Sequence, residues 1–485
     1  MNSIMLETSQ MLENHPLLIE KESYKVKYLN VLEYFSRKYS ANDSWANQTL
    51  QLYIKKFLGA KNSYKYDNFD LQRNTKPVLA TKFRPFKFFS YRYCLIIDCI
   101  FICAYGDKDK SEKIFSELSA VYHKRYQKKL RQVFDSLYDP TISTEGIEQI
   151  QYLKSCWDMN RKFITNEPTK VIITANMSAG KSTLLNALVG KKVNKTQNDA
   201  CTAKIHKIVN KPFEDNLCYE LDYLLDLDAD YHTLMDDNIN NQTSEITVGT
   251  YFRTIKTSSK RIWLIDTPGV NSSQNIEHQQ LTDRIICDTN GDLLIYLLNG
   301  ENIGTDDDRK HLLFVLEKYH GNILFVVNKL DRFRKNEDSI EGTLKAVVED
   351  LKIICFENPY VVPVSSYAAY LAKMNIFSEP LDADEQDELE RMSRKMKKPE
   401  YQLDKYYPEK IKAAVTIESD EESHQLLLHS GILHLIESFN RFLIISLDVL
   451  ICRYSPLFRA FPALFISEEP HKSFYYPLCF RSQKS

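Results

Sequence analysis

Several features that mark other protein classes are missing from this chain. The ten cysteines are scattered, with no C-x-x-C pair and no His/Cys cluster at zinc spacing. Neither a disulfide framework nor a structural zinc site is therefore predicted, and reduced thiols that fill the core are favoured. The 63 Lys and Arg residues face 65 Asp and Glu residues, which gives a formal net charge of −2 and no basic stripe. Composition gives no electrostatic reason to expect a nucleic-acid partner.

The sequence also lacks an obvious export signal and a long hydrophobic run. Residues 1–7 show no basic start followed by an apolar core, so a secretory signal is not expected. The most apolar stretch, 93–105, carries Asp98 and is shorter than the roughly 20 residues that a membrane span needs. A buried helix is favoured there. The chain is expected in the cytoplasm, and peripheral attachment to a membrane remains an alternative.

The first third of the chain reads as helical. At 485 residues the chain is long enough for two or three domains. Residues 1–165 lack the sequence patterns that mark strands and turns. Apolar residues recur there at helical spacing in the stretches 28–35, 50–58, 114–122 and 130–137. Ser143 or Thr144 is expected to cap a further helix that runs through Trp157. The basic and aromatic patch 82–89 is expected to be a loop that packs its rings on the next helix, with contact to lipid or nucleic acid as the alternative.

From Lys170 the sequence alternates strands with helices, which predicts an α/β fold: a mostly parallel sheet with helices on both faces. Predicted strands are 171–173, 205–209, 261–265, 292–299, 322–327 and 360–364, several of them near-continuous apolar runs. The acidic stretch 211–245 is expected to be a solvated insertion, and the charged stretch 376–425 to form solvated helices. A closing helix follows from Ile432. These patterns predict a helical region at 1–165, an α/β domain at 166–445 and an irregular tail at 446–485, with a truncated helical stalk as the alternative for the tail.

The chain is organised around one motif between the first strand and a helix: Ala175-Asn176-Met177-Ser178-Ala179-Gly180-Lys181-Ser182. A strand that ends in small residues and opens into a helix directs several backbone N–H groups to one point, where the helix dipole favours an anion. The spacing predicts a phosphate-binding loop, with Lys181 on the β- and γ-phosphates and the Ser182 hydroxyl on Mg²⁺. Ala175 stands where the consensus has glycine, so a helix start without a ligand is the alternative. The nucleotide contacts predicted here are Asn176, Met177, Ser178, Ala179, Gly180, Lys181, Ser182 and Thr183.

Three further motifs follow in order, each at or beyond the end of a predicted strand. They are Thr202, the D-x-x-G sequence Asp266-Thr267-Pro268-Gly269, and the N-K-x-D sequence Asn328-Lys329-Leu330-Asp331. A carboxylate at Asp331 can accept hydrogen bonds from N1–H and the exocyclic amine of guanine, a donor pair that adenine lacks, so the predicted ligand is GTP. The alternative is that Asp331 only caps the next helix. Asn328, Lys329, Asp331, Ser365 and Ser366 complete the predicted nucleotide-binding set.

The chain resembles the dynamin superfamily, specifically bacterial dynamin-like GTPases, over about residues 165–445. The resemblance is carried by Met177 to Gly190 around Ser-Ala-Gly-Lys-Ser-Thr, by Ala200-Cys201-Thr202-Ala203, and by the Asp-Thr-Pro-Gly and Asn-Lys-Leu-Asp sequences. Some Era-like GTPases come close to this pattern. The resemblance implies Mg²⁺-dependent GTP hydrolysis that is stimulated when two GTPase domains dimerise, and a role in membrane remodelling. Self-association is thus the expected partnership, with membrane lipids as a further candidate and no nucleic acid; protein partners are not predicted.

The same resemblance assigns roles to individual residues. Thr202 is the switch threonine that completes the Mg²⁺ shell and holds the water, Asp266 binds Mg²⁺ through water, and the Gly269 N–H senses the γ-phosphate. The predicted catalytic set is Lys181, Thr202, Ser178 and Gly269, and the predicted metal set is Ser182, Thr202 and Asp266.

Two departures from the family affect these expectations. Eukaryotic dynamins carry Gln where Met177 stands, and a thioether cannot orient the attacking water as that side chain does. Only a short stretch follows residue 445 in place of the family's long helical stalk. The missing stalk favours one rival function, a GTP-gated interaction switch without membrane activity. A P-loop ATPase is a second, separate rival.

Overall fold

The structure, a computed structural model, describes residues 3–66, 85–176, 178–194, 204–236, 243, 245–253, 260–268, 276–288, 291–334, 339–415 and 421–442. The described residues all fall within one compact unit, Met1–Leu443. The tail predicted for 446–485 lies outside the described residues. The domain boundaries stay a prediction.

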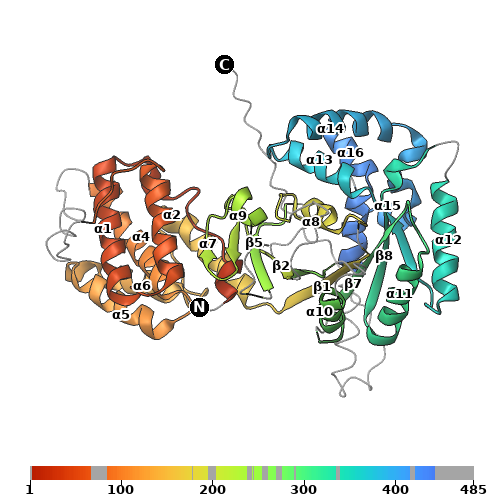
Figure 1. Cartoon of the computed structure of the whole chain (residues 1–485). Helices are drawn as coiled ribbons and strands as arrows, with labels where there is room; N and C mark the ends of the chain where they lie inside the picture. The colour runs from red at the N-terminus through yellow and green to blue at the C-terminus, as the bar shows by residue number, and fades with distance from the viewer. Residues whose placement is uncertain are drawn as a thin grey trace, which may run out of the picture. The chain divides into compact units, whose positions relative to one another are not determined.

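The N-terminal region is helical, as its sequence periodicity predicts (Figure 1). Its α-helices are α1 (Glu22–Tyr39), α2 (Ser44–Leu58), α4 (Pro85–Ala104), α5 (Lys108–Ala120), α6 (Gln127–Ser136) and α7 (Gln151–Ile164). Short 3-10 turns are η1 (Ser3–Glu7), η2 (Pro16–Ile19), η3 (Lys124–Tyr126) and η4 (Glu148–Ile150). The apolar residues at helical spacing pack together in one hydrophobic cluster, which extends onto Val209, Tyr219, Leu225 and Leu227 of the following α/β region.

Helix α4 carries the most apolar stretch of the chain and is buried at the centre of this cluster. Its single buried carboxylate, Asp98, accepts hydrogen bonds from the hydroxyls of Tyr28 and Tyr53, the latter at 2.9 Å. His15 Nε2 lies 2.9 Å from the same carboxylate. A buried charge needs such partners, which the bundle supplies. The prediction of a buried helix is confirmed; within the described residues, no helix is both long and apolar enough to cross a bilayer.

Two local predictions in this region are wrong. Neither Ser143 nor Thr144 caps a helix, because Gly146 adopts a φ of +77° that a right-handed helix does not allow. Helix α7 instead begins at Gln151, after a 3-10 turn. The patch 82–89 was predicted as a loop, but α4 begins within it at Pro85, where proline's fixed φ suits the first helical position.

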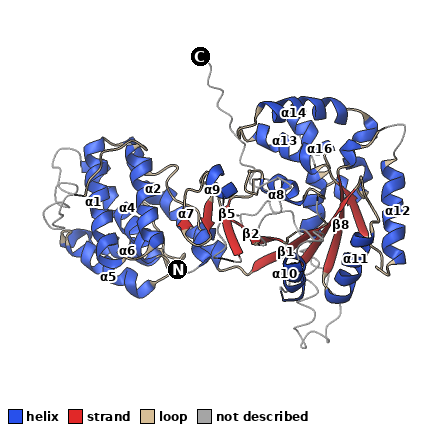
Figure 2. Cartoon of the chain, in the orientation of Figure 1, coloured by secondary structure: helices blue, strands red, loops and turns tan. Residues whose placement is uncertain are grey.

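The remainder of the described chain is built on a nine-stranded sheet with the order β4-β3-β5-β2-β6-β1-β7-β8-β9 (Figure 2). The strands are β1 (Pro168–Ala175), β2 (Ile205–Asn210), β3 (Tyr219–Leu221), β4 (Leu225–Asp226), β5 (Glu245–Thr250), β6 (Arg261–Asp266), β7 (Leu293–Asn299), β8 (Asn322–Asn328) and β9 (Tyr360–Pro363). Each predicted apolar run forms one of these strands.

The centre of the sheet is parallel. β1 pairs parallel to both β6 and β7, with Ile173 opposite Asp266 and Ala175 opposite Leu297, and β7, β8 and β9 continue in the same direction. β2 runs antiparallel to β6. Because parallel strands end at the same edge, the residues after β1, β6, β8 and β9 meet there.

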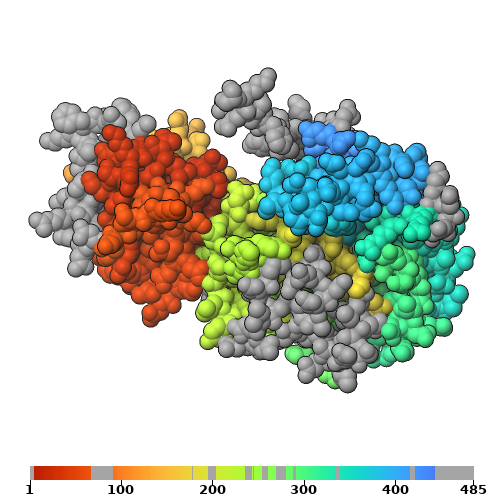
Figure 3. Space-filling model, turned by 45° about the horizontal axis from the view of Figure 1, so that its top comes forward, coloured from red at the N-terminus to blue at the C-terminus, as the bar shows by residue number. Residues whose placement is uncertain are grey.

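Helices cover both faces of the sheet. They are α8 (Lys181–Val189), α9 (Tyr231–Asp236), α10 (Ile276–Asp288), α11 (Asp306–Lys318), α12 (Ile340–Ile353), α13 (Ser366–Ile376), α14 (Ala383–Met396), α15 (Glu409–Lys412), α16 (Glu422–His429) and a last helical stretch at 432–442, with 3-10 turns η6 (Leu330–Arg332), η7 (Pro399–Tyr401) and η8 (Leu403–Tyr406). α8 and α13 share one face, whereas α10 and α11 lie on the other (Figure 1). The α/β fold class and the helical region before it are confirmed. The space-filling view shows the helices after β9, in blue, directly against the yellow residues of the first strand and α8 (Figure 3).

Two further expectations need correction. The stretch 211–245 is not simply solvated, because it adds β3 and β4 to the sheet and buries Lys211, Asp215 and Tyr219. The cysteines are not all core residues either. Among those described, Cys94, Cys99, Cys103, Cys156 and Cys218 are buried, but Cys287 and Cys355 are exposed.

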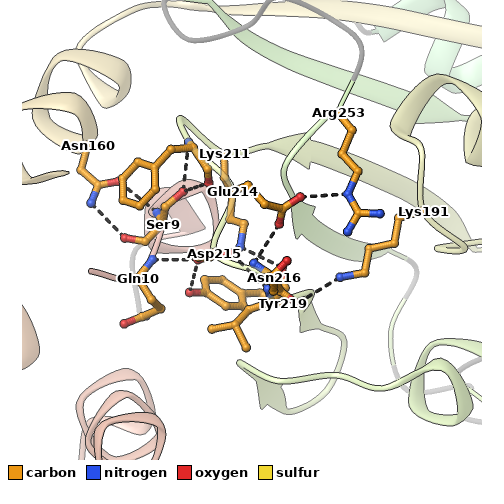
Figure 4. Close-up of polar contacts among 12 residues, drawn as sticks. Ser9, Gln10, Asn160, Lys191, Lys211, Glu214, Asp215, Asn216, Tyr219 and Arg253 are labelled. Atoms are coloured by element: carbon orange, nitrogen blue, oxygen red, sulfur yellow. Dashed lines mark hydrogen bonds and ion pairs between the residues drawn. The ribbon is translucent and has the colours of Figure 1, made fainter. Parts of the chain in front are cut away.

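The N-terminal segment joins the helices to the sheet through buried polar contacts (Figure 4). Ser9 and Asn160 of α7 exchange two hydrogen bonds, from Ser9 N to Asn160 Oδ1 at 3.0 Å and from Asn160 Nδ2 to Ser9 O at 2.9 Å. Gln10 N donates to Asp215 Oδ2 at 2.7 Å, and the other oxygen of Asp215 pairs with Lys211. Lys211 is fully buried, and its ammonium also donates to Leu217 O at 2.8 Å. Asp215 is thus the counter-ion of a buried cation and an anchor for the N-terminal segment.

Asp215→Ala is expected to destabilise the chain strongly. It leaves the Lys211 ammonium buried without its carboxylate, which typically costs about 3–5 kcal/mol. The matched control is Asp228→Ala, which removes a half-exposed partner of Lys55 and should cost no more than about 1 kcal/mol. Chemical denaturation followed by circular dichroism measures both, and similar transition midpoints for the two variants would contradict the assigned role of Asp215.

Candidate nucleotide-binding site

The loop after β1 has the backbone geometry that a phosphate-binding loop needs. Ser178 and Gly180 adopt left-handed φ angles of +62° and +91°, and Ala179 N donates to Asn176 O at 3.3 Å, which turns the chain into α8. A Cβ on Gly180 would lie 2.5 Å from Asn328 Nδ2, so only glycine fits there. Lys181, Ser182 and Thr183 form the first turn of α8, whose backbone N–H groups have no partner within the helix. The predicted loop therefore has an N-terminal helix end free to receive an anion.

Two residues predicted to bind phosphate and metal are in direct contact. The Lys181 ammonium pairs with Asp266 Oδ1 at the end of β6, and both side chains are largely buried. Asn194 Nδ2 donates to Asp266 Oδ2 at 3.0 Å. The structure thus places the cation predicted for the phosphates beside the carboxylate predicted for Mg²⁺.

Asn328 connects the N-K-x-D sequence, the predicted base-recognition motif at residues 328–331, to the phosphate loop. Its Nδ2 donates to Ala179 O at 2.8 Å, and its Oδ1 accepts from the backbone N of Ser366 at 2.9 Å. One amide therefore joins the end of β8, the loop after β1 and the first residue of α13. Asn328 acts here as a structural clamp between predicted nucleotide-binding segments.

Asp331 lies in the 3-10 turn η6 and is only 5% exposed. Burial raises the pKa of this carboxyl above its ordinary value, against a hydrogen bond with the Ser365 side chain that lowers it. Asp331 does not cap the next helix, since the N-cap of α12 is Ser339. Lys329 precedes it with a φ of +66° and lies 3.8 Å from a carboxylate oxygen of Glu301. The capping alternative is excluded, and a buried acceptor remains.

The two predicted serines after β9 reach the site in different ways. The Ser365 hydroxyl caps α13 by accepting from Ala368 N at 3.3 Å, and Ser365 also hydrogen-bonds Asp331. Ser366 contributes its backbone N–H to Asn328. Both residues therefore orient the base-recognition motif.

Three predicted site residues, Met177, Thr202 and Gly269, lie outside the described residues, and their roles stay predictions. The oxygen donors that are described, the Ser182 hydroxyl and the Asp266 carboxylate, are of the type that Mg²⁺ prefers together with water and phosphate oxygens. No group of three or more His, Cys, Asp or Glu side chains suited to a metal occurs in the described part of the chain. The donor set fits Mg²⁺ held jointly with a nucleotide.

Sequence reasoning missed several residues that support the site. Thr174 lies 2.9 Å from His311 Nε2 of α11 and accepts from Thr267 Oγ1 at 3.2 Å, which braces β1 against the D-x-x-G segment. Burial lowers the pKa of His311 to about 4, so the ring is neutral at physiological pH. Lys373 of α13 is fully buried and donates to the carbonyls of Ala187 and Leu188 at the end of α8. These contacts join residues far apart in sequence, so no local pattern indicates them.

Comparison with known proteins identifies the same segment. Residues 171–330 match the model of the dynamin family. Over 214 residues the chain is 25% identical to a probable transmembrane GTPase, FZO-like, of Arabidopsis thaliana chloroplasts, covering 44% of this chain and 21% of the relative. Over 280 residues it is 24% identical to dynamin-like protein A of Bacillus subtilis, covering 56% of this chain and 22% of the relative.

Solved structures give weaker matches. An oligomerised bacterial dynamin pair is 15% identical, with 89% of this chain and 72% of that chain covered and a TM-score of 0.35. The chain spans only about a fifth of the length of the two curated relatives. Within these limits, the family match, the motifs and the parallel sheet support one conclusion: residues 171–330 are similar to the GTPase segment of the dynamin family.

Proposed function

We propose that this chain binds GTP with Mg²⁺ and hydrolyses it to GDP and phosphate. The observation that carries the proposal is the amide of Asn328, which holds the base-recognition motif against the phosphate loop through Ala179 and against α13 through Ser366. One nucleotide can then place its base at Asp331 and its phosphates at Lys181. The dynamin-family match over 171–330 supports the same reaction.

Each end of the nucleotide has a defined set of partners in this proposal. The backbone N–H groups around Gly180 and the Lys181 ammonium receive the phosphates, for which Lys181 must exchange its contact with Asp266 for one with the ligand. Mg²⁺, when bound, neutralises charge that develops on the β- and γ-phosphates. The Ser182 hydroxyl and the released Asp266 carboxylate are the residues that would hold it. The buried Asp331 carboxylate accepts from the two donors of guanine.

Nucleotide competition tests the proposal. Binding of a fluorescent GTP analogue should be displaced by GTP and GDP but not by ATP, and phosphate release should require Mg²⁺ and stop when EDTA is added. Equal displacement by ATP would favour the P-loop ATPase instead. Binding without phosphate release would favour the GTP-gated switch.

We further propose that turnover is completed by a second copy of the chain across the nucleotide, with peripheral attachment to membranes as its cellular setting. The family resemblance supports both ideas, and no Arg or Gln stands beside the phosphate loop in the sequence to complete the site alone. Specific GTPase activity is therefore expected to rise with protein concentration.

Light scattering with GDP and aluminium fluoride checks the expected dimer. A species that stays monomeric contradicts the dimer mechanism. Turnover measured with and without liposomes, in the same concentration series, separates a membrane-stimulated enzyme from one that responds to concentration alone.

A further inference from the structure

The last turn of α8, the helix that begins at the phosphate loop, is held by a side chain from another helix. The last four carbonyls of an α-helix have no partner within it. Two of them, on Ala187 and Leu188, accept hydrogen bonds from Lys373 Nζ of α13, the second at 3.5 Å. The carbonyls before and after this pair accept from the backbone N–H groups of Gly190 at 2.8 Å and Arg253 at 3.0 Å. Lys373 thus completes the hydrogen bonding at this end of α8.

Packing alone does not explain a lysine at this position. Lys373 is fully buried, and a buried charge costs free energy that an apolar side chain of similar length would avoid. Burial lowers the pKa of Lys373 to about 7. The neutral amine still carries two N–H groups, one for each carbonyl, so the bonds to α8 need no particular protonation state. These directional bonds are therefore what the side chain contributes.

Helices α8 and α13 are joined at both ends. Near their starts, Asn328 donates to Ala179 O at 2.8 Å and accepts from Ser366 N at 2.9 Å. Lys373 follows Ser366 by about two helical turns and therefore lies on the same side of α13, where it meets the end of α8. Hydrophobic contacts between the helices are non-directional, whereas bonds to two successive carbonyls fix how far α13 lies along α8.

The two helices hold opposite ends of the proposed ligand. The phosphates are assigned to Lys181 and the first turn of α8, and the base to Asp331, which is hydrogen-bonded by Ser365 at the N-cap of α13. A ligand that reaches both positions gains affinity, because its second contact forms within one complex. It loses that gain when the separation of the two positions no longer matches its length. The placement of α8 relative to α13 therefore bears directly on nucleotide affinity.

We propose that Lys373 is a positioning residue for the nucleotide: its bonds to the last turn of α8 keep the phosphate-binding end of that helix at the distance from Asp331 that one guanine nucleotide spans. The inference rests on the proposed GTP binding. Lys373 acts through α8, from the end of the helix opposite the phosphates. Neither half of the nucleotide needs this role on its own, because a separate base or a separate phosphate group can adjust to its own subsite.

Lys373→Met tests this role in the full-length chain with Mg²⁺. Three probes compete with a fluorescent GDP analogue: GDP, which spans both subsites, and guanosine and inorganic pyrophosphate, which each occupy one. We expect the Kd for GDP to rise about tenfold or more, because methionine fills the space but cannot bond to α8 and the two subsites lose their spacing. The affinities for guanosine and pyrophosphate should stay within about twofold of the wild type, because each probe depends on one subsite only.

A loss of general stability would give a different result. It would lower the melting temperature without nucleotide and weaken all three probes together, whereas a change in spacing affects GDP alone. Unchanged GDP affinity, or equal losses for the three probes, would overturn the inference. Lys373→Leu repeats the comparison with a second apolar side chain. If neither variant folds, Lys373 is needed for the fold itself and its assignment to the nucleotide is wrong.

Lys192→Met is the matched control. Lys192 lies just beyond the same end of α8, and its ammonium pairs with Glu385 of α14 at 3.2 Å, so the change removes a lysine contact and leaves the bonds of Lys373 in place. All three probes should bind this variant as they bind the wild type. If the wild-type chain does not bind GDP, the proposed function fails, and this inference fails with it. If the wild type binds GDP and Lys373→Met binds it equally well, only this inference fails.

Discussion

Asp331→Asn is expected to weaken GTP binding roughly a hundredfold or more and to create binding of xanthosine triphosphate. In the proposed complex the buried carboxylate accepts from N1–H and the exocyclic amine of guanine, and hydrogen bonds to a charged group contribute about 1.5–3 kcal/mol each. An amide can accept from N1–H of xanthine and donate to the carbonyl that replaces the amine. Sites built on such paired polar groups discriminate strongly, because a wrong partner leaves buried groups unpaired.

Titration of labelled nucleotides into the wild type and the variant measures this exchange. Asp387→Asn on the exposed side of α14 is the matched control and should leave both affinities unchanged. Acidification gives a second readout. Burial raises the pKa of Asp331, so on acidification this carboxylate becomes protonated at a higher pH than an exposed Asp does. Wild-type GTP binding should therefore already weaken at a pH where an exposed Asp is still ionised. Wild-type affinity for GTP in Asp331→Asn would show that another residue recognises the base.

The fold around the candidate nucleotide site was predictable from sequence where a local pattern determines local geometry. A buried strand must be apolar, a loop that turns into a helix needs Gly180 at a φ of +91°, and the carboxylate proposed to accept from guanine follows β8 directly. Each of these requirements appears in consecutive residues. The alternation of strands and helices then indicates a mostly parallel sheet with helices on both faces, which explains why the fold class was predicted correctly, although it does not determine the strand order.

The supporting contacts could not be predicted, because they depend on the tertiary fold. Asn194 meets Asp266 across 72 positions of sequence and Asp308 meets Asn176 across 132, and no periodicity connects either pair. Charge alone was also misleading. The stretch 211–245 looked solvated because it is acidic, yet its Asp215 is buried as the partner of Lys211. Burial of a charge is decided by whether a counter-ion is placed beside it.

Lys181→Ala is expected to reduce the affinity for both GTP and GDP by roughly a hundredfold or more. The variant removes the one cation of the loop that contacts the phosphates, and each charge-assisted hydrogen bond lost is worth about 1.5–3 kcal/mol. The ligand-free protein changes as well, because Asp266 loses its ion pair with Lys181 and, among the described residues, keeps only the hydrogen bond from Asn194. The carboxylate then adds uncompensated negative charge where the phosphates must enter.

Thermal shift with increasing nucleotide separates these two effects. A change in the melting temperature without nucleotide reports the lost ion pair, whereas the further rise with nucleotide reports affinity, because a ligand stabilises the folded state in proportion to ln(1 + [L]/Kd). Lys191→Ala, which lies just beyond the other end of α8 and donates to Asn216 O at 3.2 Å, is the matched control and should keep the full nucleotide-dependent rise. If Lys181→Ala shows the same rise as the wild type, the phosphates are held by some other cation, and the loop after β1 is not the phosphate site.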